Sequence, residues 1–139
     1  MNKKLLALIL LILIPISVQA RDISELKFIK LASYEEINSY CLQPEEYDPV
    51  SGCYLATEEI YLRNDLPLER FIFVFWHEIG HFFMKGITDE QFGEVFNPTP
   101  QKLGATIISE VAADTFALWI MGGKVPKVQK EFFIQAILK

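Results

Sequence analysis

The chain has 139 residues, 51% of them hydrophobic, and a formal net charge of −5 at pH 7. This length is enough for one domain and no more. An acidic chain without a basic block is a poor partner for the phosphates of nucleic acids or for anionic lipids, so we expect no nucleic-acid partner. Eleven phenylalanines and two tryptophans supply ample material for the core of a small globular fold.

The first twenty residues, MNKKLLALILLILIPISVQA, have the three-part pattern of a secretory signal: two lysines, an apolar run and small residues at the end. We expect cleavage after Ala20, which leaves residues 21–139 as a single secreted or periplasmic domain. The apolar run is shorter than the roughly 20 residues of a membrane span, so we expect no stable span after cleavage. An uncleaved N-terminal anchor is the alternative.

Cys41 and Cys53 are the only cysteines. An even number of cysteines in an exported chain favours a disulfide, whereas two buried free thiols are the alternative. Residues 21–47 are compatible with a prosegment that masks a site. A bridge from Cys41 would instead tie these residues to the mature fold.

Residues 23–32 are compatible with either a strand or a helix. Ser33 and Glu36 fit a capping box before a short helix that ends near Cys41. Residues 42–52 contain two prolines and a glycine and predict a loop. Residues 53–63, CYLATEEIYLR, predict short strands in a hairpin that turns near Thr57 and Glu58.

A long helix is predicted to follow, with Asn64 or Asp65 as its cap and Pro67 in its first turn. It should end near Lys85, because Gly86 is suited to the left-handed conformation that terminates helices.

Residues 87–100, which contain one glycine and two prolines, predict a connection. A second long helix should run from about Gln101 to Met121, and a short amphipathic helix should start at Pro126. The expected fold is therefore a small α+β domain, with short strands packed on two long helices and a short C-terminal helix.

His77 and His81 are the only histidines in the chain, and they lie four residues apart on the first long helix. Residues at this spacing share a helix face, so both imidazoles can bind one metal ion. Glu78 follows the first histidine and can reach a metal-bound water without binding the metal. The pattern His-Glu-x-x-His is typical of two zinc ligands and a general base. The alternative is a pair of core histidines, although polar rings buried among phenylalanines without partners are costly.

A catalytic zinc site usually has three protein ligands, and the chain contains no third histidine. Glu110 and Asp114 lie four residues apart on the second long helix, among apolar and small residues. We expect Glu110 to be the third ligand and Asp114 to accept the outer N–H of His77 and orient its ring. The alternative is a solvated acidic helix face.

The segment HEIGH followed by SEVAAD resembles the gluzincin pattern of zinc metallopeptidases. It is also similar to the compact ImmA/IrrE-type peptidase domains, which pair HExGH with an E-x-x-A-[ND]-x-F-A helix. The resemblance covers about residues 48–122. It implies a zincin-like fold, one Zn²⁺ ion, a third ligand at Glu110 and a histidine-orienting acid at Asp114. Larger gluzincins stabilise the oxyanion with a downstream histidine, which this chain lacks. Tyr54 and Tyr61 are the candidates for that role.

We therefore expect an exported zinc-dependent metalloendopeptidase in which a zinc-bound water activated by Glu78 cleaves a peptide or protein substrate. The substrate would lie along an edge strand such as residues 59–62. A zinc-binding sensor or partner-binding module of the same fold is one alternative. An exported structural or inhibitor domain without metal is the other.

Overall fold

The computed structural model describes residues 23–41, 50–96 and 105–138. These ranges contain a three-stranded sheet and five α-helices, which confirms the expected α+β class. The elements in chain order are a 3₁₀ turn η1 (Ile23–Glu25), β1 (Phe28–Ala32), α2 (Tyr34–Tyr40), β2 (Gly52–Leu55), β3 (Glu59–Arg63), α3 (Leu68–Phe83), α4 (Asp89–Phe96), α5 (Ala105–Ile120) and α6 (Lys127–Ile137). The predicted signal peptide and most of the predicted loop 42–52 lie outside the described residues.

The sheet has the strand order β1-β3-β2. β2 and β3 form the predicted antiparallel hairpin, which turns at Thr57 and Glu58. β1 pairs with β3 in parallel, with Phe28 opposite Glu59. β3 is therefore the central strand, and the prediction that residues 59–62 form an edge strand is wrong. The parallel pairing joins segments far apart in the sequence, so no local sequence pattern predicts it. Of the two edges of the sheet, the one that lies near the long helix α3 is formed by β2.

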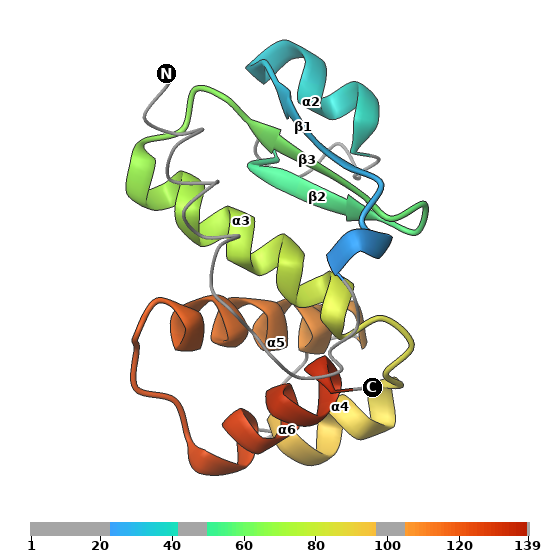
Figure 1. The fold of residues 1–139 in the computed structure, drawn as a ribbon, viewed down its shortest axis with the longest axis vertical. Helices are drawn as coiled ribbons and strands as arrows, with labels where there is room; N and C mark the ends of the chain where they lie inside the picture. The colour runs from blue at the N-terminus through green and yellow to red at the C-terminus, as the bar shows by residue number, and fades with distance from the viewer. Residues whose placement is uncertain (1–22, 42–49, 97–104, 139) are drawn as a thin grey trace.

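The two faces of the sheet carry different helices (Figure 1). Side chains alternate between the faces along a strand. Ile60 and Leu62 belong to the main core, together with the residues of α3. Tyr61 lies on the other face, in a smaller cluster with Ala32, Ile37 and Cys41 under α2.

The predicted capping box begins α2. Glu36 N–H donates to Ser33 Oγ at 3.2 Å, and Ser33 N–H donates to Glu36 Oε2 at 3.0 Å. At the other end of this helix Cys41 forms a disulfide with Cys53 on β2, which confirms the predicted bridge. The bridge fastens α2 to the strand at the free edge of the sheet.

Removing the bridge by replacing both Cys41 and Cys53 with serine should lower the free energy of unfolding by about 3 kcal/mol, because the short loop no longer constrains the unfolded chain. Urea unfolding of the oxidised protein and the double variant measures the difference. The oxidised protein treated with reductant is the control and should match the variant. Equal stability of all three would contradict a stabilising bridge.

The first long helix is confirmed, but its predicted cap is wrong. Pro67 occupies the N-cap of α3 without a side-chain hydrogen bond. The Asp65 carboxylate binds the Arg63 guanidinium at 2.8 Å instead. Asn64 N–H donates to the Ala32 carbonyl and continues the sheet contacts. Gly86, at φ 82°, adopts the expected left-handed conformation after the helix.

Residues 89–96 form the helix α4, where the sequence analysis predicted a connection. Its first turn has a capping box: Gln91 N–H donates to Thr88 Oγ1, and Thr88 N–H donates to Gln91 Oε1. The sequence contains the capping-box signature Thr-x-x-Gln, which indicates the start of a helix. The glycine at position 93 favoured a connection instead.

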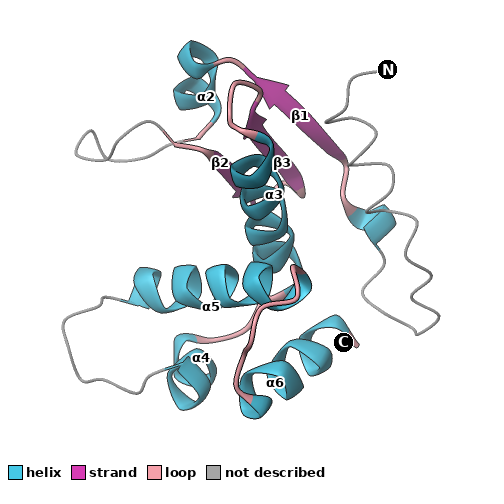
Figure 2. Ribbon diagram, turned by 90° about the vertical axis from the view of Figure 1, so that its left-hand side faces the viewer, coloured by secondary structure: helices cyan, strands magenta, loops and turns pink. Residues whose placement is uncertain are grey.

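α5 crosses α3, and α4 and α6 lie on the far side of α5 (Figures 1 and 2). The crossing is close because Gly80 faces Phe116, which is 1% exposed. Ala112 and Ala113 on α5 are completely buried. Beyond the crossing, Phe116 and Trp119 contact the ring of Phe133 on α6.

Replacing Gly80 with valine should destabilise the metal-free protein by about 1–3 kcal/mol, because the core must then be overpacked. A Cβ at this position would lie 3.1 Å from Phe116 Cδ1, tighter than ordinary contact. Thermal unfolding in chelator measures the effect. Gly93→Val on α4 is the matched control, since a Cβ there meets nothing within 4 Å. An unchanged melting temperature for Gly80→Val would show that the helices tolerate a wider separation.

Candidate metal site

The His-Glu-x-x-His segment lies in the second half of α3. The potential ligand atoms of His77, Glu78 and His81 all lie within 4.8 Å of one another, close enough to hold a metal ion. Both histidine side chains are mostly buried, and Glu78 is only 4% exposed. One helix face thus presents both imidazoles, as the spacing predicts, and the Glu78 carboxylate lies close to them.

Glu110 approaches this group from α5. Its Oε2 lies 3.0 Å from His77 Nε2, and its Oε1 lies 3.2 Å from His81 Nε2. The two Nε2 atoms are 3.0 Å apart. The structure therefore brings the predicted third ligand to the two histidines, with one carboxylate oxygen directed at each ring.

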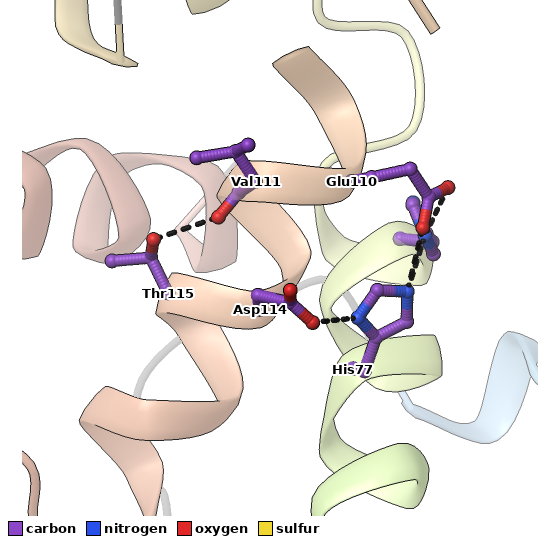
Figure 3. A network of polar contacts seen from close by, with 6 residues as sticks. His77, Glu110, Val111, Asp114 and Thr115 are labelled. Carbon is purple, nitrogen blue, oxygen red and sulfur yellow. Dashed lines mark hydrogen bonds and ion pairs between the residues drawn. The ribbon is translucent and has the colours of Figure 1, made fainter. Parts of the chain in front are cut away.

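Asp114 contacts the opposite side of the His77 ring, which lies between the two acids of α5 (Figure 3). Its Oδ1 is 2.8 Å from His77 Nδ1. A carboxylate can only accept a hydrogen bond, so Nδ1 carries the proton and donates it. In the neutral ring the lone pair of Nε2 then faces Glu110 and His81. This is the position that the sequence analysis predicts for a histidine-orienting acid.

The charges of these side chains are strongly coupled. Burial lowers the pKa of His77, but the hydrogen bonds with Asp114 and Glu110 outweigh it and raise the pKa to about 10. Burial raises the pKa of Glu110, but the hydrogen bonds with the two histidines hold it well below its usual range. The site thus favours positive charge between its acceptors, whether a proton or a metal ion supplies it.

Glu78 has a different environment. Burial raises its pKa to about 7, although the neighbouring His77 and His81 act in the opposite direction. Its carboxylate accepts a hydrogen bond from the backbone N–H of Tyr54 on β2. A carboxylate of this pKa can take up and release a proton near neutral pH.

The two acids of α5 are more exposed than the sequence suggested. The side chains of Glu110 and Asp114 are 51% and 57% exposed, although their neighbours in the sequence are apolar and small residues. Only the stripe that contains Ala112, Ala113 and Phe116 is buried. The acids occupy the adjoining face, which borders a cavity.

This cavity has a volume of about 930 Å³, and β2 forms one of its walls. Arg63 N–H donates to the Ser51 carbonyl. Ser51 and every second residue after it therefore direct their backbone N–H and C=O groups toward β3. The backbone polar groups of Gly52 and Tyr54 consequently point toward the free edge, in agreement with the bond from Tyr54 N–H to Glu78. A free strand edge thus runs beside the metal-binding group.

The two tyrosines proposed for oxyanion stabilisation are separated by the sheet. Tyr54 lines the cavity, and its hydroxyl donates to the Glu58 carboxylate, which also pairs with Lys85. Tyr61 lies on the α2 face, stacked on Tyr40 at a centroid distance of 4.5 Å. The structure brings only Tyr54 to the cavity.

Two features of the cavity were missed from the sequence. No sequence pattern indicates that the Tyr54 N–H reaches Glu78, because the contact is between the backbone of a strand and a distant helix. Arg70 also lines the cavity. Its spacing of seven residues before His77, two turns along the same helix face, was a usable signal.

Comparison of the chain with protein-family models, with curated proteins and with solved structures found no match.

Replacing Asp114 with asparagine should weaken the binding of Zn²⁺ by about 10- to 100-fold, because the His77 ring loses the acceptor that orients it. Competition with a chromophoric chelator measures the dissociation constant. Asp89→Asn is the matched control, since Asp89 lines the same cavity and is not among the residues that contact the histidines. Equal affinity of both variants would remove Asp114 from the site.

Proposed function

We propose that the protein is an exported zinc-dependent metalloendopeptidase. His77, His81 and Glu110 are its zinc ligands, Glu78 is its general base, and Asp114 orients His77. The observation that carries this proposal is the convergence of the two Nε2 atoms and the Glu110 carboxylate beside a buried Glu78.

The donor set fits zinc. Imidazole nitrogen and carboxylate oxygen are common zinc ligands, and two histidines with one glutamate form a known catalytic set. Ligand atoms 2.0–2.1 Å from a tetrahedral zinc ion lie about 3.3 Å from one another. Here the two Nε2 atoms are 3.0 Å apart, and the Glu110 carboxylate lies 3.0 Å from one through Oε2 and 3.2 Å from the other through Oε1. Residues from two helices therefore stand at nearly the spacing that a single ion requires.

Glu78 and Glu110 compete for the role of third ligand, because both carboxylates lie near the histidines. Each oxygen of Glu110 faces one histidine nitrogen, whereas the Glu78 carboxylate is held by the Tyr54 N–H. We assign the ligand position to Glu110 for this reason. Glu78 is left with the position of a base that stands beside the ion without binding it.

Bound zinc would supply Lewis acidity, polarising the scissile carbonyl and lowering the pKa of water. Glu78 takes a proton from the attacking water and delivers it to the nitrogen of the departing amine. Its bond from Tyr54 N–H keeps the carboxylate in place during both transfers. Asp114 retains the Nδ1–H proton of His77, so that the same ring nitrogen always faces the ion.

The free edge of β2 supports an extended peptide as the substrate. An unpaired strand edge binds a peptide through backbone hydrogen bonds, and Gly52 offers its backbone groups there. β2 takes the role that the sequence analysis assigned to residues 59–62. All four residues of β2 line the cavity, which supports the binding of an extended segment and hence cleavage within a chain.

The Cys41–Cys53 disulfide is compatible with an extracellular location. Together with the secretory pattern of residues 1–20, it supports a secreted or periplasmic enzyme. Across the described ranges, no helix has the length and hydropathy of a membrane span.

Replacing Glu78 with glutamine should leave one zinc ion bound and slow the hydrolysis of unfolded protein substrates by about 10²- to 10⁴-fold, because the general base is lost. Elemental analysis and single-site cleavage rates measure the two properties. Glu69→Gln is the matched control, since it alters an exposed acid on the same helix.

Equal hydrolysis by the wild type and Glu78→Gln would exclude Glu78 as the base. Zinc binding without hydrolysis in either protein would favour the non-proteolytic sensor or partner-binding module. The absence of bound zinc, with no effect of chelator on the melting temperature, would favour the structural alternative.

A further inference from the structure

Arg70 lines the same cavity as the metal-binding group, two turns before His77 on α3. A separation of seven residues corresponds to roughly 10 Å along the helix axis. The guanidinium carbon lies 5.6 Å from the centroid of the Phe73 ring, which also lines the cavity. A cation held over an aromatic face has a restricted orientation. The cavity therefore carries a positive group on α3, two helical turns before His77.

The direction of β2 relative to α3 places Arg70 at one end of the strand. A Cβ on Gly52 would lie 2.8 Å from Val74 Cγ1, so the start of β2 packs on the turn that follows Arg70. Tyr54, two residues later, reaches Glu78 one turn further along α3. Strand and helix thus run in the same direction along the cavity, and Arg70, one turn before Val74, lies level with the residues that precede β2, such as Val50.

Among the described residues, the charges around the cavity leave Arg70 available to a ligand. Lys85, the other cation of the cavity wall, pairs with Glu58. Arg70 forms no ion pair within the described part of the chain, and its guanidinium lies over the Phe73 ring. Of the residues that the structure describes, the acids of the wall gather at the histidines or belong to α4: Glu78, Glu110, Asp114 and Asp89. A carboxylate entering the cavity is repelled near the metal site and attracted at Arg70.

We propose that Arg70 binds a carboxylate of the peptide substrate and so determines which bond reaches the metal site. The proposal rests on the peptidase function proposed above. A guanidinium matches the two oxygens of a carboxylate better than any other side chain does. An extended peptide advances about 3.3 Å per residue, so the carboxylate lies about three residues from the scissile bond. Either an Asp or Glu side chain or a free C-terminus can supply it.

Binding to the zinc-loaded Glu78→Gln protein tests this inference without turnover. The probes are neutral ten-residue peptides with acetylated and amidated ends, a series with one Asp moved through each position, and the parent peptide with a free C-terminal carboxylate. Fluorescence anisotropy gives the dissociation constants. We expect one Asp position, or the free C-terminus, to bind about fivefold to tenfold more tightly than the neutral parent.

Adding Arg70→Gln should remove this preference, and adding Arg70→Glu should transfer it to peptides with Lys at the same position. Lys124→Glu is the control, because it makes the same charge change as Arg70→Glu at an exposed loop position outside the cavity lining. It should leave the preference intact. Zinc content and melting temperature verify that each variant is folded. A preference that survives Arg70→Gln, or no preference for a carboxylate at any position, overturns the inference.

Cleavage of the same peptides by the zinc-loaded wild type separates this inference from the proposed function. Cleavage that does not depend on Arg70 retains the peptidase and removes the carboxylate site. Arg70-dependent binding without cleavage by the wild type retains the carboxylate site and removes the peptidase.

Discussion

The close crossing of α3 and α5 is the constraint on which the rest of the site depends. Gly80 presents no side chain to Phe116, so the two helices approach until short side chains on either side of the contact can meet. His81 follows Gly80 directly, and Asp114 precedes Phe116 by two residues on α5. The hydrogen bond from His77 to Asp114 then fixes the rotation of one helix relative to the other. A wider crossing would leave the histidines without their carboxylate partners.

The cluster formed at this crossing is suited to a cation. Nitrogen lone pairs and carboxylate oxygens that face one another at 3.0–3.2 Å repel unless positive charge lies among them. Burial strengthens this requirement on the α3 side, while the half-exposed acids of α5 keep the cluster open to the cavity. A site with this balance can accept an ion from solvent and still leave one side of it open for a reacting group.

The sheet contributes β2 as a wall of the cavity, and a disulfide and backbone hydrogen bonds fix the position of this strand. The disulfide from Cys41 holds β2 on one side, and the hairpin to β3 holds it on the other. The edge of β2 is thereby placed where the Tyr54 N–H meets Glu78. The strand that would bind an extended peptide is thus directly connected to the residue that would transfer the proton. Arg70 lines the same cavity, beyond the N-terminal end of this strand.

Local patterns in the sequence determined the features that depend on near neighbours. The spacing of His77 and His81 placed both rings on one helix face, and Ser33 with Glu36 predicted the start of α2. The spacing of Glu110 and Asp114 likewise made them partners on one face of α5. The tertiary structure decided what depends on distant segments. The parallel pairing of β1 made β3 central, and the strand register placed Tyr54 in the cavity and Tyr61 behind the sheet. The exposure of Glu110 was also decided there, because it depends on which face of α5 packs and which borders the cavity. Such features follow from contacts between residues far apart in the chain. The free energy of these contacts depends on several segments at once, so no single segment of the sequence predicts them.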